Sequence, residues 1–379
     1  MSREVIGTAR QSSAARLVSL DAFRGIAIAG MILVNNPGTW RAVYWPLRHA
    51  SWDGCTPADL IFPFFLFAVG VSVTLSIAPS VQRGESRCRL LVKTLRRGLT
   101  IFGLGIFLNG FPRFDLSVLR IPGVLQRIAL CYVCASIAVL TLRVRGQGLT
   151  AAISLIGYWA MMALIPVPGD ASRGLTPDAN LAAYIDNALL HGHLLHDGWD
   201  PEGLLSTLPA VGTTLFGVLA GHWLRSAQVP SRCALGLFVG GGLAVGCGLV
   251  MGVWFPINKS LWTSSYAVFT AGVALNLLAT CYWLIDVRGY YRWAAPFIVY
   301  GTNSIVAYVL SSLLAKVLLL WTTSGAGGSR LPFQQYLFEA LFLRLARPID
   351  ASLLYAVAYV MLWLGITGFL YRRRIIIKI

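Results

Sequence analysis

Residues 48–77 read RHASWDGCTPADLIFPFFLFAVGVSVTLSI, a polar stretch at 48–59 followed by an unbroken apolar run at 60–77. An apolar run of that length can cross a bilayer as a helix. The polar stretch contains His49, one of five histidines in the chain, and a histidine can accept and release protons near neutral pH. The order of the two segments predicts a membrane helix with candidate chemistry at its amino-terminal end.

Composition extends this prediction to the whole chain. Of the 379 residues, 56% are hydrophobic and only 12% are charged, and the mean hydropathy is +0.68, outside the range of ordinary soluble domains. We predict one integral-membrane domain over 1–379, an all-α polytopic transmembrane bundle of about 10 spans. A short interfacial helix is expected at 333–345, after the Gly/Ser-rich residues 322–332. The expected spans are 20–35, 60–77, 98–111, 122–142, 149–165, 204–224, 234–255, 266–285, 296–321 and 353–371.

The net charge of +16 does not indicate nucleic-acid binding, because the basic residues form short clusters between apolar runs. The positive-inside rule explains such clusters. Of the 31 lysines and arginines, 20 fall on the side that holds both chain ends, in the two tails 1–19 and 372–379 and in alternate loops, of which the predicted basic loop 79–97 is the densest. We therefore expect cytoplasmic termini, a long periplasmic loop at 166–203, and His49 on or near the periplasmic side.

The first candidate site joins the polar stretch to the end of the first span. Asp53 is four residues after His49 and is a candidate to orient its ring, as a general base requires. Asn35 could donate its amide to a developing oxyanion, and Asp59 completes the set. The residue types favour equally an interfacial loop in which His49 and Trp52 anchor at the lipid headgroups.

Four further motifs place polar residues beside or inside apolar runs. In 120–127, Gln126 and Arg127 would lie one turn inside the bilayer, where charges usually line a polar cavity, with snorkelling to the interface as the alternative. Asp200 and Glu202 flank Pro201 at a predicted helix start, where capping explains one acid and the presence of two equally indicates a substrate-facing role. Residues 256–265 form a polar turn, and Asn303 is expected to make an interhelical hydrogen bond.

Other signals point away from metal and nucleotide chemistry. His191, His193 and His196 lack a nearby set of acids or cysteines, so a mobile polar loop is favoured over a metal site, and we expect no metal. The C-x-x-C of Cys131 and Cys134 lies inside an apolar run and is read as packing. The absence of Walker, G-x-S-x-G and H-E-x-x-H motifs argues against NTP-driven transport, serine hydrolysis and metalloprotease activity.

Together these motifs resemble the heparan-α-glucosaminide N-acetyltransferase family, in which transmembrane acetyltransferases include bacterial members. The resemblance rests on motifs in family order at 16–25, 34–35, 49–54, 59–63, 120–127, 200–203, 256–262 and 301–304. It implies transfer of an acetyl group from cytoplasmic acetyl-CoA to the amine of a glucosamine-type sugar across a bacterial inner membrane. The motif histidine falls on His49 and the motif asparagine on Asn35.

On this reading His49 is the general base, with Asn35 and Asp53 completing the catalytic set. The substrate- and co-substrate-binding set is Arg24, Asp59, Arg120, Gln126, Arg127, Asp200, Glu202, Asn258, Lys259, Trp262 and Asn303. Expected partners are acetyl-CoA, an amino-sugar acceptor and the lipid bilayer, with a homodimer left open and no nucleic acid. Arg24, Arg96 and Arg97 are candidates for the phosphates of acetyl-CoA.

Two alternatives remain at this stage. One is a transporter or flippase for a sugar or acyl carrier that uses Arg127, Asp200 and Glu202 as a polar path. The other is O-acetylation of an envelope polysaccharide. The sequence also leaves open whether transfer is direct or passes through an acetyl-histidine.

Overall fold

The quoted stretch folds into a loop and a long helix. The computed structural model describes residues 17–168, 174–177, 179–226, 228–324 and 330–377. Helix α3 (Pro57–Gln82) begins directly after Thr56, and Thr56 and Asp59 form a capping box. A capping box satisfies two of the backbone N–H groups that a helix start leaves unpaired. Pro57 suits the first helical position because it has no N–H to leave unpaired.

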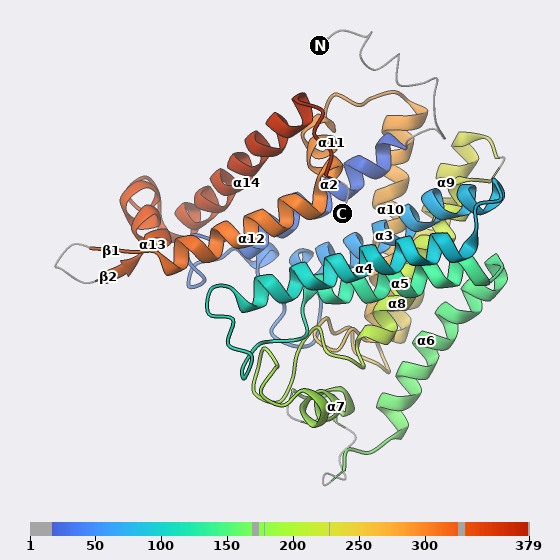
Figure 1. The fold of residues 1–379 in the computed structure, drawn as a ribbon, viewed down its shortest axis with the longest axis horizontal. Helices are drawn as coiled ribbons and strands as arrows, with labels where there is room; N and C mark the ends of the chain where they lie inside the picture. The colour runs from blue at the N-terminus through green and yellow to red at the C-terminus, as the bar shows by residue number, and fades with distance from the viewer. Residues whose placement is uncertain (1–16, 169–173, 178, 227, 325–329, 378–379) are drawn as a thin grey trace.

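All ten predicted spans correspond to helical segments, drawn as ribbons in Figure 1. Most bounds differ by a few residues from the predicted ones. The other long helices are α2 (Val18–Asn35), α4 (Arg87–Gly110), α5 (Val124–Thr141), α6 (Val144–Leu164), α8 (Thr207–Leu224), α9 (Pro230–Met251), α10 (Ser264–Cys281), α11 (Ala295–Thr302) with α12 (Ser304–Leu320), and α14 (Pro348–Arg372). Shorter helical pieces are Trp45–Leu47, α7 (Leu181–Leu190), α13 (Phe333–Leu337), and the π-helical turns Tyr282–Val287 and Phe338–Phe342.

Seven helices in the described residues are long and apolar enough to cross a membrane, and the bent pair α11–α12 makes up to eight. This confirms the polytopic, helical membrane fold. The two remaining predicted spans, α4 and α8, are helical but are not among the helices that are apolar enough to cross a membrane. The number of crossings therefore stays a prediction.

Two local predictions are wrong, and two further segments contain secondary structure that the sequence does not indicate. The basic residues of 79–97 do not form one loop, because α4 already begins at Arg87; arginine and lysine are good helix formers, and a turn at Gly84 is enough to reverse the chain. The segment 166–203 is not all loop, since it contains α7. The predicted span 296–321 is broken by 84° between α11 and α12. Within 322–332, β1 (Thr322–Ser324) pairs antiparallel with β2 (Arg330–Pro332).

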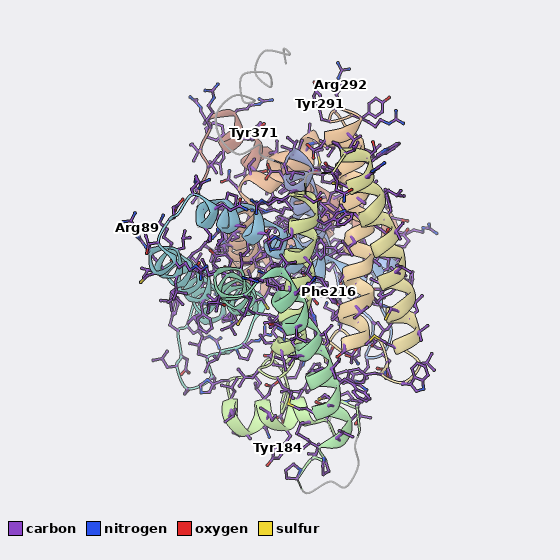
Figure 2. All side chains as sticks on the ribbon, turned by 90° about the vertical axis from the view of Figure 1, so that its right-hand side faces the viewer. Arg89, Tyr184, Phe216, Tyr291, Arg292 and Tyr371 are labelled. Carbon is purple, nitrogen blue, oxygen red and sulfur yellow. The ribbon has the colours of Figure 1, made fainter. Side chains whose placement is uncertain are left out.

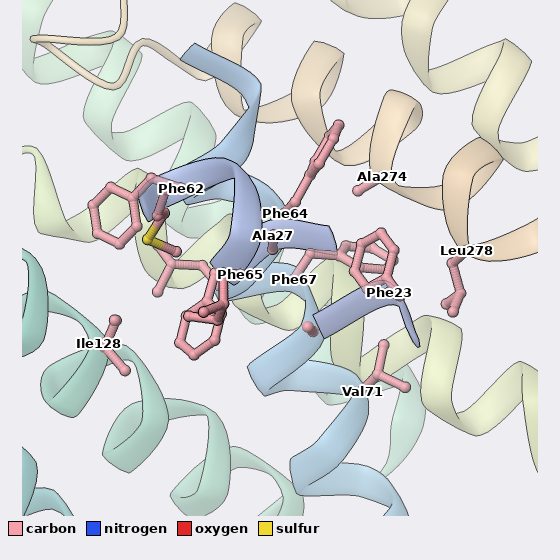
Figure 3. Packing of buried hydrophobic residues seen from close by; sticks show 14 of the residues in the cluster. Phe23, Ala27, Phe62, Phe64, Phe65, Phe67, Val71, Ile128, Ala274 and Leu278 are labelled. Atoms are coloured by element: carbon pink, nitrogen blue, oxygen red, sulfur yellow. The ribbon is translucent and has the colours of Figure 1, made fainter. Parts of the chain in front are cut away.

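The core lies where α2, α3, α5 and α10 meet. Figure 3 shows the phenylalanines of α3, among them Phe64, Phe65 and Phe67, packed with Phe23 of α2 and Ala274 of α10. Helices α3 and α8 also approach backbone to backbone. A Cβ on Gly70 would lie 1.9 Å from the Thr214 carbonyl oxygen, and one on Gly217 would lie 2.0 Å from that of Phe67. Only glycine permits this approach.

The two ends of the bundle carry different segments. In Figure 2, Tyr184 of α7 lies at one end, and Tyr291 and Arg292, between α10 and α11, lie at the other. The connections 111–123 and 191–206 lie on the α7 side (Figure 1). Trp52 links the polar stretch 48–59 to the 166–203 segment. Its Nε1 donates to the Leu175 carbonyl (2.7 Å), and its ring packs edge-on against Trp199.

Candidate functional site

His49 and Asp59 form the centre of the site. His49 Nδ1 lies 2.7 Å from Asp59 Oδ1. The other carboxylate oxygen, Oδ2, accepts from the backbone N–H groups of Ala50 and Thr56 and from the Thr56 hydroxyl, each at 3.0 Å. The capping box thus turns Asp59 back toward the loop and fixes it there. The Asp59 side chain is 1% exposed and that of His49 is 36% exposed, so the imidazole bridges a buried acid and an open surface.

Lys259 is the third member of this group. Its Nζ lies 2.9 Å from Nδ1 and 3.3 Å from Nε2 of His49, and 3.3 Å from Asp59 Oδ1. Burial lowers the pKa of Lys259 below its ordinary value, although the charges of Asp59 and Glu202 oppose the shift. The amine, the imidazole and the carboxylate therefore lie within 3.3 Å of one another.

Asp53 has a different partner from the one predicted. Its Oδ1 accepts from Asn258 Nδ2 (3.1 Å), whereas Asp59 holds the His49 ring. The prediction that Asp53 orients His49 is therefore wrong. The cause is the pairing of Asp53 and Gly54 with Asn258, in which Gly54 N–H donates to the Ile257 carbonyl (2.7 Å) and directs Asp53 toward 256–265.

Hydrogen bonds within the 256–265 turn hold its backbone, from which Lys259 extends. Asn258 Oδ1 accepts from the Leu261 N–H (2.9 Å), and the Thr263 hydroxyl donates to the Pro256 carbonyl (2.7 Å). Trp262 is buried and donates its indole N–H to Thr213 Oγ1 (3.1 Å). Lys259 therefore reaches His49 from a turn whose backbone is held by hydrogen bonds.

A second charged group joins the connections at the same end of the bundle. Arg120 makes a bidentate pair with Asp200, with Nε–Oδ2 at 2.8 Å and Nη2–Oδ1 at 2.7 Å, and Nη2 also contacts Glu202 Oε2 at 2.6 Å. Burial opposes the charge on Arg120, but the two acids outweigh it and raise the pKa of Arg120. Asn109 fixes the loop by donating to the Arg120 and Pro122 carbonyls.

Arg127 and Gln126 lie inside the bundle as predicted for a polar interior. Arg127 is 1% exposed, donates from Nη2 to the Gly203 carbonyl (3.1 Å) and Ser206 Oγ (2.5 Å), and lies over the Trp262 ring. Its Nε and Nη1, and Gln126 Nε2, are buried without a hydrogen-bond partner in the described part of the chain. Burying a donor without a hydrogen-bond partner costs free energy. These N–H groups are therefore candidates to donate hydrogen bonds to a ligand oxygen.

The two groups are neighbours. The Trp262 ring, over which Arg127 lies, packs edge-on against Tyr266 with the ring centroids 5.3 Å apart. The Tyr266 hydroxyl donates to the Asp59 backbone carbonyl (2.6 Å). Glu202, the partner of Arg120, acts electrostatically on Lys259. His49, Asp59, Lys259, Arg120 and Glu202 therefore belong to one polar region.

Asn35 lies in a different group of residues from this polar region. It is exposed and lines a pocket of about 430 Å³ whose walls include Trp40, Gln334, Glu339 and Tyr359. Across the described ranges no hydrogen bond or ion pair joins Asn35 to His49. A catalytic role for Asn35 stays a prediction.

Arg24 and Asn303 belong to a separate group at the α11–α12 break. Arg24 Nη2 donates to Ser304 Oγ (2.8 Å) and lies 3.8 Å from Asp21. Asn303 donates to the Ile375 carbonyl (3.0 Å) and accepts from the Ile377 N–H (2.9 Å). The prediction of an interhelical bond is wrong for Asn303, because its amide binds the backbone of the segment after α14.

The three histidines of 191–196 make unrelated contacts. His191 pairs with Asn187, His193 with the Leu119 carbonyl, and His196 stacks on Trp199. Three residues that hold the site are not among the predicted ones, namely Thr56, Ser206 and Tyr266. The T-x-x-D pattern at 56–59 could have identified Thr56, whereas no local pattern links Ser206 or Tyr266 to partners so distant in sequence.

The fold and this site define a multi-pass helical membrane protein with buried ionisable residues gathered on the α7 side of the bundle, a pattern that usually marks function. Residues 16–241 match the family described as heparan-alpha-glucosaminide N-acetyltransferase, catalytic. The chain belongs to this family, and the resemblance stated from the motifs is confirmed.

Individual relatives agree with that assignment. The chain is 31% identical over 359 residues to heparan-alpha-glucosaminide N-acetyltransferase of Mus musculus, covering 79% of this chain and 54% of the relative. It is 32% identical over 354 residues to the Homo sapiens protein of the same name, covering 78% and 52%. An Escherichia coli protein described as uncharacterized protein YeiB is 26% identical over 289 residues, covering 74% and 68%. The chain spans about half the length of the mouse and human relatives.

Proposed function

We propose that this chain is an acetyl-CoA-dependent transmembrane N-acetyltransferase. The acceptor is the amine of a glucosamine-type sugar on the non-cytoplasmic side of a bacterial inner membrane, and both termini are cytoplasmic. The observation that carries the proposal is the His49–Asp59 pair, a half-exposed imidazole oriented by a buried carboxylate in a chain of this family.

The pair has the chemistry of a general base. Asp59 accepts the Nδ1 proton of His49, which leaves the Nε2 lone pair free to take a proton from the acceptor amine. As His49 takes that proton, the amine nitrogen bonds to the acetyl carbon and the carbon–sulfur bond of the thioester breaks. The departing thiolate then takes up a proton.

The unpaired donors of Arg127 and Gln126 fit an acetyl donor, because thioester and amide carbonyl oxygens accept hydrogen bonds from such groups. We assign these donors to the acyl and pantetheine carbonyls. Arg24, Arg96 and Arg97 are assigned to the nucleotide phosphates by their charge and expected cytoplasmic side. Asn35 is assigned to polarise or position the thioester carbonyl.

The test uses detergent-purified protein, radiolabelled acetyl-CoA and glucosamine. We expect label on the sugar amine, and a rate about 10²–10⁴-fold lower for His49→Ala, the range that general-base catalysis contributes. The matched control is His191→Ala, an exposed histidine paired only with Asn187, which should keep the wild-type rate. Full acetyl transfer by His49→Ala contradicts the mechanism, and vesicle uptake of unmodified sugar favours a transporter.

A further inference from the structure

Lys259 lies close to both nitrogens of the proposed base. Its Nζ is 2.9 Å from Nδ1 and 3.3 Å from Nε2 of His49. A charge that close to both nitrogens is affected by a proton on either one. The backbone of Lys259 belongs to the internally bonded 256–265 turn, and its side chain is only 20% exposed and also contacts Asp59 Oδ1 at 3.3 Å.

Hydrogen-bond chemistry selects one arrangement of protons. Asp59 Oδ1, 2.7 Å from Nδ1, can only accept, so Nδ1 carries a proton and cannot also accept from Lys259. Lys259 then donates to Asp59 Oδ1 at 3.3 Å. Nε2 then keeps its lone pair and is the basic atom of the ring, and Nζ of Lys259 lies 3.3 Å from that nitrogen.

Four ionisable groups from separate segments surround this ring or its partners. Asp59 comes from α3 and Lys259 from the 256–265 turn. Glu202 acts on Lys259 from the connection after α7. Cys55, on the same loop as His49, stays a neutral thiol because burial raises its pKa to about 12. Lys259 is therefore the cation nearest to the ring, and Asp59 is the nearest anion.

We propose that Lys259 is a positioning residue that keeps His49 unprotonated and ready to act as a base. The proposal rests on the proposed function and assigns Lys259 to the histidine rather than to substrate binding. A second proton on the ring would place two positive charges within 3.3 Å of each other. Without Lys259, only the Asp59 carboxylate would remain in contact with the ring, and a carboxylate favours the protonated imidazole.

The test measures protonation of His49 without requiring enzymatic turnover. Diethyl pyrocarbonate modifies neutral imidazole, and peptide mass spectrometry reports the modification of His49 as a function of pH. In Lys259→Met, and in Lys259→Gln as a second neutral variant, we expect the midpoint of modification to move up by roughly 1–3 pH units. Lys259→Arg, which keeps a cation, should restore a midpoint near wild type. The exposed Lys93 supplies the matched control Lys93→Met, expected to change nothing.

Acetyl transfer gives the second measurement. The acid limb of the pH–rate profile should move to higher pH in the two neutral variants and return toward wild type in Lys259→Arg. An unmoved or lowered midpoint in the neutral variants overturns the role of Lys259, even if wild type transfers acetyl. If wild type transfers no acetyl but the midpoint moves, the proposed function fails and the coupling of Lys259 to His49 stands.

Discussion

At the scale of single residues, the contact between Asp59 and Nδ1 predicts that Nε2 is the basic nitrogen of His49. Asp59→Asn keeps the shape of the side chain but introduces an amide that can donate to Nδ1, which would leave the proton on Nε2. We expect acetyl transfer to fall about 10²–10⁴-fold, because the base then has the wrong tautomer. Turnover of purified protein at saturating acetyl-CoA and acceptor measures this effect.

Asp53→Asn is the matched control, since an asparagine there can still accept from Asn258 Nδ2 through its carbonyl oxygen. It should keep activity within a few-fold of wild type. A larger loss in Asp53→Asn than in Asp59→Asn would return the orienting role to Asp53.

The same residues show how much of the candidate site can be predicted from the sequence. His49, Asp59 and Lys259 were all predicted as site residues from their motifs, but their pairing was not. Spacing favoured Asp53 over Asp59 because four residues look close in sequence, whereas the capping box of α3 decides the contact. Lys259 is 210 residues from His49, and only tertiary structure determines that proximity.

At the scale of elements, Arg120 and Asp200 join the connection between α4 and α5 to the one between α7 and α8. The Asp200 side chain is fully buried, so Arg120→Met leaves its charge without a cationic partner, which typically costs about 3–5 kcal/mol. We expect a clearly lower melting temperature of the detergent-purified protein, measured by tryptophan fluorescence.

A second arginine pair supplies the control. Arg83 contacts Glu85 at 3.0 Å in an exposed turn, and exposed pairs contribute about 0–1 kcal/mol. Arg83→Met should therefore melt close to wild type. Equal melting of the two variants would show that the Arg120 pair does not hold the two connections together.

The element that could not be predicted is the α11–α12 break. Residues 296–321 are mainly apolar around the motif Gly301-Thr302-Asn303-Ser304, and no proline lies near Asn303 to indicate an interruption. The Asn303 amide instead donates to the Ile375 carbonyl and accepts from the Ile377 N–H. Glycine, threonine, asparagine and serine are weaker helix formers than the residues around them, and the contact from the far end of the chain, which hydropathy does not report, adds to that local weakness.

At the scale of the whole molecule, the proposed reaction needs its two substrates on opposite sides of the membrane. The charge distribution predicts cytoplasmic termini and places the α7 end outside. Tyr184 and Arg292 lie at opposite ends of the bundle (Figure 2) and are both exposed. They therefore offer a matched pair of reporter positions.

In a background without the seven natural cysteines, Tyr184→Cys should react with a membrane-impermeant maleimide in intact cells with a permeabilised outer membrane. Arg292→Cys should react only after the inner membrane is opened, because the positive-inside rule places that connection in the cytoplasm. The reverse pattern would put His49 on the same side as cytoplasmic acetyl-CoA. Acetyl transfer would then need no path through the bundle, and the unpaired donors of Arg127 and Gln126 would lose their assignment along that path.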